Sequence, residues 1–327
     1  MNASSPPPRR RLILDCDPGQ DDAVCLLLAF AARDVFDILG VTVVAGNVGL
    51  ELAAKNARRI IDLAGADEIP VYAGCARPLA RPLVTAHHVH GPSGLDGMDL
   101  FEPRSPLQPR HAVDYMIETL MTAAPASVTL VPTGPLTNVA MALVKEPRVA
   151  DRIEAIVMMG GAMREGGNIT PSAEFNIFVD PHAAEIVLNC GRPVTMIGLD
   201  ATHQVLCSKR RIEKIRNIGG PIAEAVYGML AFFNRYDSAK YGVDGAPLHD
   251  PCTIAFLLAP ALFAAKPCHV AVETASALTA GHTAVDFWGV TGAAPNVDFV
   301  HSVDADGFFD LLTERLRRFT RDGAVPS

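Results

Sequence analysis

The sequence lacks several features by which common protein classes are recognised. No apolar stretch runs uninterrupted for the roughly 18 residues that a membrane helix requires, so we predict no contact with a membrane. Only 28 lysines and arginines stand against 36 acidic residues, and the net charge of −8 argues against a nucleic-acid partner, because binding to phosphates needs a basic surface. The seven cysteines are scattered without a C-x-x-C pair, which is typical of free thiols in a reducing compartment and predicts a cytoplasmic protein.

Three motifs of widespread nucleotide-binding and hydrolytic enzymes are also missing. No G-x-G-x-x-G follows the first apolar run, which argues against a dinucleotide-binding fold of that type. The absence of a G-x-x-x-x-G-K-[ST] loop excludes a P-loop nucleotidase, and the absence of a G-x-S-x-G turn excludes a serine hydrolase built on that turn.

What the chain does contain is an alternation of short apolar runs and helical patterns. The runs are continuous rather than alternating, which indicates strands buried on both faces of a sheet. Their alternation with helices predicts an α/β fold with a mostly parallel central sheet flanked by helices. The expected strands cover residues 12–14, 37–44, 128–131, 153–159 and 194–199, and the expected helices cover 23–32, 50–64, 111–123, 136–146 and 181–190.

Beyond residue 200 the pattern changes. We expect helices near 208–217, 220–236 and 250–258, β-like runs near 268–274 and 283–290, and a final helix near 306–320. No linker or internal repeat divides the chain of 327 residues. The sequence therefore predicts a disordered N-terminal arm over residues 1–8 and, over residues 9–327, a single elaborated domain with extra C-terminal helices and a small β segment.

Four aspartates directly follow the first expected strand, where ligands of an open α/β sheet bind. Asp15, Asp17, Asp21 and Asp22 fall within eight positions. Like charges at the end of a buried strand repel one another and are costly to desolvate unless a cation neutralises them. Oxygen ligands without a cluster of histidines or cysteines favour Ca²⁺ or Mg²⁺. The alternative is a helix start capped by aspartates, which needs only one or two carboxylates.

The spacing of the first two aspartates invites a second comparison. Aspartate-nucleophile phosphatases also carry a D-x-D pair after the first strand. They have Thr or Val two residues after the second aspartate, whereas this chain has Gly19, and they give no role to an additional pair such as Asp21 and Asp22.

The residues from Asp15 to Ala23 resemble the D-x-D-P-G-x-D-D-A signature of the nucleoside hydrolases of the inosine-uridine preferring type. Further blocks follow in the order of that family between residues 11 and 321, which makes the resemblance specific. These blocks are Val44–Asn47, Ala86–Gly91, Leu130–Asn138, Met159–Gly161, Ala173–Asn176, Asp180–Pro181 and His249–Pro251. The resemblance implies a Ca²⁺-dependent hydrolase that cleaves the N-glycosidic bond of ribonucleosides to free base and ribose.

The resemblance also implies a set of site residues. Its Ca²⁺ ligands are Asp17, Asp22, Asp250 and the backbone carbonyl of Thr133, and Asp17 also accepts a proton from the Ca²⁺-bound water. Several acceptors around the 2′- and 3′-hydroxyls imply a requirement for ribose rather than deoxyribose. The residues matched to substrate binding are Asp21, Asn47, Asn168, Glu174, Phe175 and Asn176, with His90 and His249 on the base side.

Some of these residues have simpler alternative explanations. His249 could protonate or hydrogen-bond the departing base, or it could cap a helix. His90 could belong to a lid over the site or to an ordinary surface loop. Glu174 and Asn176 could represent polarity at a strand edge. His87 and His203 are left unassigned.

The base preference depends on the segment from Lys240 to Asp250, which resembles the pyrimidine-preferring branch of the family. In that branch a tyrosine at the position of Tyr241 contacts the pyrimidine and a glutamine stands at position 237, where this chain has Asp237. The single tryptophan, Trp288, lies outside the matching blocks, which argues against strict purine specificity. We therefore expect uridine and cytidine as substrates, with inosine as a further candidate.

Two other functions remain open on the sequence alone. One is a metal-dependent phosphohydrolase that uses Asp15 or Asp17, and the other is a non-catalytic module that binds Ca²⁺ or ribose. The resemblance further implies a homodimer or homotetramer.

Overall fold

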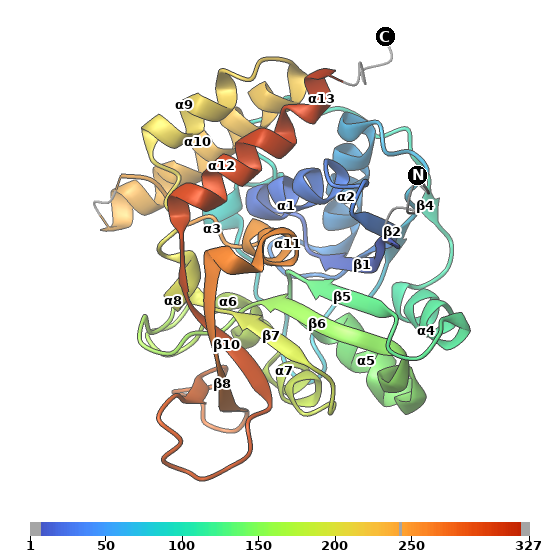
Figure 1. Ribbon diagram of the computed structural model, residues 1–327, viewed down its shortest axis with the longest axis vertical. Helices are drawn as coiled ribbons and strands as arrows, with labels where there is room; N and C mark the ends of the chain where they lie inside the picture. Colours follow the sequence, from blue (N-terminus) through green and yellow to red (C-terminus); the bar gives the residue numbers. More distant parts are fainter. Residues whose placement is uncertain (1–7, 242–243, 322–327) are drawn as a thin grey trace, which may run out of the picture.

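The computed structural model describes residues 8–241 and 244–321, and the side chains of residues 236–241 lie outside the description, as does all but the last residue of the predicted N-terminal arm. Within the described residues, ten strands form one sheet in the order β4-β3-β2-β1-β5-β6-β7-β10-β8-β9 (Figure 1). Neighbours from β4 to β10 pair in parallel, and β8 and β9 are antiparallel. The predicted α/β fold with a mostly parallel sheet is confirmed. The strands are β1 (Arg10–Cys16), β2 (Phe36–Val43), β3 (Val71–Ala73), β4 (Leu107–Gln108), β5 (Val128–Pro132), β6 (Ile153–Met159), β7 (Val194–Ile197), β8 (Phe263–Val272), β9 (Thr283–Asp286) and β10 (Val297–Val303).

Helices cover both faces of the sheet, because successive side chains of a strand point to opposite sides. In β1, Leu12 and Leu14 pack into the core beneath α1, α2 and α10 to α12, whereas Ile13 packs into the core beneath α4, α5 and α7 (Figure 1). The longer helices are α1 (Gln20–Phe30), α2 (Leu50–Ala64), α4 (Ala112–Thr122), α5 (Thr137–Lys145), α7 (Pro181–Leu188), α9 (Lys209–Arg216), α10 (Pro221–Tyr241), α11 (Pro251–Leu258) and α12 (Ala305–Leu316). The short ones are α3 (His87–His90), α6 (Phe175–Val179), α8 (Leu199–Thr202) and α13 (Arg318–Arg321), with 3₁₀ turns η1 (Pro147–Arg152) and η2 (Pro260–Leu262).

The expected elements before residue 200 are present, with α1 starting three residues earlier than predicted. The C-terminal β segment was predicted less well. No strand was expected at β10, because Asp298, His301 and Ser302 interrupt its apolar residues. β10 pairs in parallel with β7 and antiparallel with β8, so this segment continues the main sheet.

Two further properties can be read from the described residues. Their helices include none that is both long and apolar enough to cross a membrane. The seven cysteines are all free thiols, as predicted.

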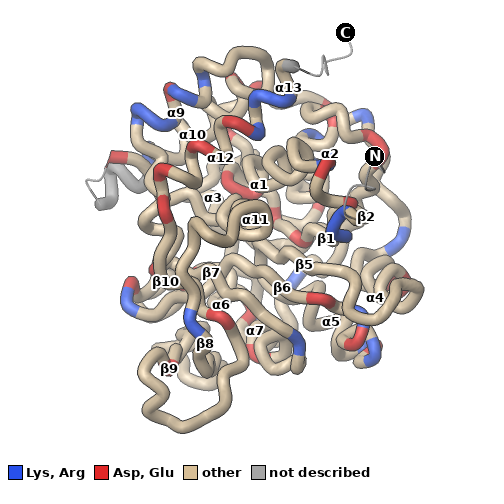
Figure 2. Tube along the Cα trace, viewed as in Figure 1, with Lys and Arg blue, Asp and Glu red and all other residues tan. Residues whose placement is uncertain are grey.

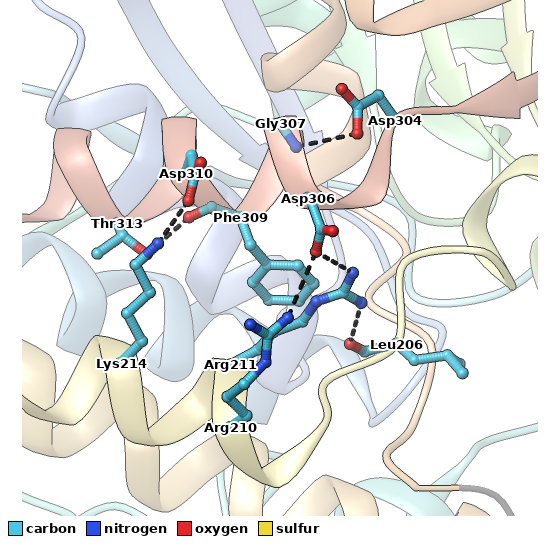
Figure 3. A network of polar contacts seen from close by, with 10 residues as sticks. All are labelled: Leu206, Arg210, Arg211, Lys214, Asp304, Asp306, Gly307, Phe309, Asp310 and Thr313. Atoms are coloured by element: carbon cyan, nitrogen blue, oxygen red, sulfur yellow. Dashed lines mark hydrogen bonds and ion pairs between the residues drawn. The ribbon is translucent and has the colours of Figure 1, made fainter.

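Helix α12, the last long helix of the described residues, is joined to α9 by a network of charged residues. Figure 2 shows basic positions along α9 beside acidic positions of α12, and Figure 3 shows their pairing. Arg211 is the central residue, because its guanidinium donates to Asp306 at 2.7 Å and to the carbonyl of Leu206 at 2.8 Å. The same group lies 4.7 Å from the centroid of the Phe309 ring.

We expect the substitution Arg211→Ala to lower the free energy of unfolding by about 2 kcal/mol, because hydrogen bonds from a charged group that is largely withdrawn from water are lost. The side chain of Arg211 is 17% exposed. Arg210 is the matched control, since its side chain is 82% exposed and lies 3.8 Å from the same carboxylate. Such a pair contributes about 0.5 kcal/mol or less. Urea unfolding of both variants measures the difference, and equal losses would contradict the assignment.

Candidate active site

A cavity of about 430 Å³ lies among the residues that follow the carboxyl ends of the parallel strands. This is the edge of the sheet at which the sequence placed the site. The structure brings most of the predicted residues to its wall. The predicted residues that line it are Asp21, Asn47, His90, Thr133, Asn168, Glu174, Phe175, Asn176, His249 and Asp250. The side chains of Tyr241 and Asp237 lie outside the described residues.

A cluster of buried carboxylates lies at and beneath the floor of the cavity. Oxygens of Asp21, Asp22 and Asp250 all lie within 4.8 Å of one another. Asp17 and Asp22 are fully buried and do not reach the cavity wall. The distant part of the chain that supplies Asp250 is the start of α11, which packs against α1.

Several of these oxygens have no protein partner. Asp17 accepts a hydrogen bond from the backbone N–H of Asn47 at 2.7 Å through Oδ2, but its Oδ1 has none. Oδ1 of Asp21 and Oδ2 of Asp15 are also buried without a partner. Buried acceptors are normally satisfied, and a cation is a partner that these unpaired carboxylate oxygens could share. Among the described residues, no lysine or arginine forms an ion pair with any of them.

The pKa values of the cluster are shifted in the direction that this crowding predicts. Burial raises the pKa of Asp15 and of Asp21 to about 7, and repulsion from Asp22 adds to both shifts. Burial raises the pKa of Asp17 and Asp250 well above the usual range for a carboxyl. The bare cluster therefore holds protons near neutral pH, whereas a cation would keep it ionised.

Two glycines make room for Asp17. A Cβ atom at Gly46 would collide with Oδ2 of Asp17, and one at Gly134 would collide with Oδ1. These glycines follow β2 and β5, the two neighbours of β1, so the backbone closes around the carboxylate from both sides. This explains why glycine stands in both loops.

The helix-cap alternative accounts for one carboxylate of the cluster. Asp22 accepts from the backbone N–H of Gly19 at 3.1 Å, as a capping residue does, and also from the Thr133 hydroxyl at 2.7 Å. Asp17, Asp21 and Asp250 have no such capping bond. The carbonyl of Thr133, which was predicted as a metal ligand, accepts from the side chain of Asn176 at 2.7 Å and keeps a second lone pair.

Glu174 caps a helix rather than lying at a strand edge, so that alternative was wrong. Its carboxylate accepts from the backbone N–H groups of Asn176 (2.9 Å), Ile177 (3.2 Å) and Gly161 (2.9 Å), and burial raises its pKa to about 7. Asn168 accepts from the N–H of Phe175 at 2.9 Å. These bonds fix the start of α6 against the ends of β6 and of the loop that follows it.

The two predicted histidines are held in place by different elements. His90 ends the short helix α3, is buried, and stacks on Phe233 of α10 with ring centroids 5.6 Å apart. His249 precedes α11 and pairs with the hydroxyl of Thr202 at 2.7 Å. Burial lowers the pKa of both rings to about 3. His90 thus belongs to the cavity wall rather than to an exposed loop, whereas His87 does not line the cavity.

Comparison with known proteins identifies the family. The sequence profile described as inosine-uridine preferring nucleoside hydrolase matches residues 12–310. The chain belongs to the inosine-uridine preferring nucleoside hydrolase family. It is therefore an enzyme that hydrolyses N-glycosyl bonds of ribonucleosides, which replaces the phosphohydrolase and non-catalytic alternatives.

Its relatives cover nearly the whole chain. The pyrimidine-specific ribonucleoside hydrolase RihA of Photobacterium profundum is 49% identical over 311 residues, which span 95% of this chain and 99% of the relative. The protein of the same name from Shewanella woodyi is 48% identical over 313 residues, with the same coverage. Among solved structures, a purine-preferring ribonucleoside hydrolase from Gardnerella vaginalis matches with a TM-score of 0.88 at 30% identity, covering 96% of this chain and all of the other.

The cavity of this nucleoside hydrolase also contains residues that sequence reasoning missed. Nδ1 of His203, next to Thr202 after β7, lies within hydrogen-bond distance of the Glu165 carboxylate at 3.0 Å, and its ring lies 5.9 Å from that of His249. Both residues line the cavity, as do His88 and Phe233. The positions of His203 and Glu165 after strands β7 and β6 were a usable signal, because the loops after β1, β2 and β5 at this edge also contribute to the site. Phe233 gave no signal, since it reads as an ordinary apolar residue of a helix.

Proposed function

We propose that this nucleoside hydrolase cleaves pyrimidine ribonucleosides, uridine and cytidine above all, in a Ca²⁺-dependent reaction. The observation that carries the proposal is the buried carboxylate cluster with its unpaired oxygens, which lies at and beneath the floor of a cavity lined elsewhere by amides, imidazoles and apolar side chains. The pyrimidine preference is supported by relatives named as pyrimidine-specific at 48–49% identity, well above the 30% of the purine-preferring structure.

The donor set fits Ca²⁺. Asp17, Asp22, Asp250 and the second lone pair of the Thr133 carbonyl would hold the ion, and all are hard oxygen ligands. The unpaired buried oxygens and the raised pKa values of the carboxyls support a cation at this place. When bound, the ion would neutralise the cluster and lower the pKa of a water molecule that it ligates.

The chain's own residues would then perform the reaction. We assign Asp17 as the base that accepts the proton of the attacking water, because its Oδ1 has no other partner. Asp21, Glu174 and Asn176 would hold the ribose hydroxyls while positive charge develops on the sugar, and Asn47 and Asn168 would support them. His249 would assist the departure of the base.

The test is a panel of uridine, cytidine, inosine and thymidine, with the release of reducing sugar as the readout. We expect turnover of the two pyrimidine ribonucleosides at the highest kcat/KM, and a clear excess for inosine would contradict the preference. Absence of sugar release from every ribonucleoside would contradict the proposed activity itself.

We also expect 2′-deoxyuridine to be cleaved with a kcat/KM lower than that of uridine by about 10³-fold or more. A site whose buried polar groups pair with a hydroxyl is left with unpaired groups when that hydroxyl is missing. A discrimination below tenfold, with both substrates measured under saturating Ca²⁺, would show that the 2′-hydroxyl is not gripped.

A further inference from the structure

His90 and His249 each use one ring nitrogen for a hydrogen bond inside the protein, and both rings line the cavity. In both cases the nitrogen is Nδ1, which leaves Nε2 as the nitrogen that the ring can offer to a ligand. A neutral imidazole carries its single proton on only one of the two nitrogens. The partner of Nδ1 therefore decides whether Nε2 is a donor or an acceptor.

The partner of His90 is an acceptor. Gln20 donates its amide N–H groups to the carbonyls of His90 at 2.9 Å and Asp96 at 3.1 Å, which fixes the orientation of the amide. Its Oε1 consequently faces Nδ1 of His90 at 2.6 Å. Because an amide oxygen only accepts, Nδ1 must carry the proton and Nε2 must be an acceptor.

The close contact with the backbone strengthens this conclusion. A Cβ atom at Gly19 would lie 2.5 Å from Nδ1 of His90, so this edge of the ring is pressed against the loop after β1 and is closed to a ligand. His90 is 6% exposed, and burial favours its neutral form.

The partner of His249 is a donor. Thr202 is fully buried, and among the described residues its hydroxyl has only Nδ1 of His249 as a hydrogen-bond partner, at 2.7 Å. If the imidazole donated this bond, the hydroxyl proton would be buried without an acceptor, which is costly. The hydroxyl therefore donates, Nδ1 accepts, and the ring proton is on Nε2. No carboxylate of the described residues lies within ion-pair distance of His90 or His249.

We propose that Gln20 and Thr202 are positioning residues that hold His90 and His249 as opposite neutral tautomers. The base side of the cavity then presents one acceptor, Nε2 of His90, and one donor, the Nε2–H of His249. The assignment of the tautomers is independent of the proposed function. Their consequence for the departing base rests on that function. His90 can receive an N–H or O–H of the nucleoside but has no proton to give, so of these two histidines only His249 can donate a hydrogen bond to the departing base.

The direct test is the tautomeric state of each ring in the Ca²⁺-loaded, ¹⁵N-histidine-labelled protein, read from long-range ¹H–¹⁵N correlation spectra near pH 7.5. The variants His90→Gln and His249→Gln assign the two signals by their disappearance. We expect a protonated Nδ1 in His90 and a protonated Nε2 in His249. The same tautomer in both rings, or the reverse pair, would overturn the proposal.

Substitution of Gln20 tests whether this residue sets the tautomer of His90. Gln20→Met should convert the single tautomer of His90 into a mixture. The matched control is Asn56→Ala, because Asn56 also tethers this segment, through bonds to the carbonyls of Pro18 and Ser93, without contacting His90. A pure Nδ1–H tautomer in Gln20→Met, or an equal change in the control, would show that Gln20 does not set it.

Enzyme kinetics of Thr202 variants test whether the hydroxyl of this residue positions His249. Thr202→Val keeps the shape but removes the hydroxyl, whereas Thr202→Ser keeps the hydroxyl and removes the methyl. With uridine we expect kcat of the valine variant to fall about tenfold at nearly unchanged KM, and the serine variant to remain near the wild type. Equal effects of the two substitutions would show that Thr202 contributes only through packing.

The spectra require no turnover. A protein without nucleoside hydrolysis but with the expected tautomers would therefore overturn the proposed function and leave this inference intact.

Discussion

Replacing Asp17 with asparagine is expected to lower kcat for uridine by about 10³-fold or more, which is within the range that a general base contributes. Asparagine fills the same space and can still accept from the N–H of Asn47. It cannot take a proton from water, and it weakens the charge that would hold a cation. The measurement is steady-state release of reducing sugar at saturating Ca²⁺.

Stability separates this effect from misfolding. The carboxylates of the bare cluster repel one another, so Asp17→Asn should leave the melting temperature of the Ca²⁺-free protein unchanged or raise it. Asp310→Asn is the matched control, because it makes the same chemical change on α12, where Asp310 forms an exposed ion pair with Lys214 of α9. Turnover of Asp17→Asn within tenfold of the wild type would contradict the assignment, as would a comparable loss in the control.

The sequence predicted the sheet well because its strands are continuous apolar runs between short turns. It missed the short strands β3 and β4 at one edge of the sheet. It also failed at β10, where Asp298, His301 and Ser302 interrupt a strand that is recognisable only once β7 and β8 lie on either side of it. Pairing between distant segments is not encoded in local periodicity, so this kind of strand could not be predicted from its own residues.

Most carboxylates of the site could be predicted because, like the apolar strands, they form a local pattern in the sequence. Asp17, Asp21 and Asp22 lie close together in the chain, and their density already predicted a cation site. The place of Asp250 in the cluster was predicted only from the resemblance. Asp250 is distant in the chain, and it reaches the cluster because α11 packs against α1. The partners of the histidines, Gln20 and Thr202, could not be predicted at all. Gln20 lies inside the acidic motif and reads as a spacer until the structure places His90 beside it.

Removal of Ca²⁺ is expected to lower kcat by about 10³-fold or more, because the ion would supply several kcal/mol of transition-state stabilisation. It is also expected to change how stability depends on pH. In the Ca²⁺-free protein the pKa of Asp15 and of Asp21 is about 7, whereas an aspartate in the unfolded chain titrates near its usual value of about 4.

The sign of the pH dependence follows from these values. Between about pH 4 and pH 7 the folded Ca²⁺-free protein holds more protons than the unfolded chain, so its stability is greatest at the acidic end and is lost as pH rises through 7. The proposed ligands Asp17 and Asp250 also have raised pKa values, so Ca²⁺ must displace protons from the cluster and its affinity increases with pH. The stabilisation by a fixed concentration of Ca²⁺ should be larger at pH 8 than at pH 6.

Thermal unfolding with a chelator and with excess Ca²⁺, at both pH values, measures this difference. Long chelation is needed, since a buried ion leaves slowly, and the metal content is determined alongside. Asp250→Asn is the informative variant, because the loss of one ligand carboxylate should shrink the Ca²⁺-dependent shift in melting temperature most at pH 8, which lies above the pKa of about 7 of Asp15 and Asp21. A shift that is equal at the two pH values, or larger at pH 6, would mean that the ion does not compete with protons for this cluster. The carboxylates would then need another explanation for their unpaired oxygens.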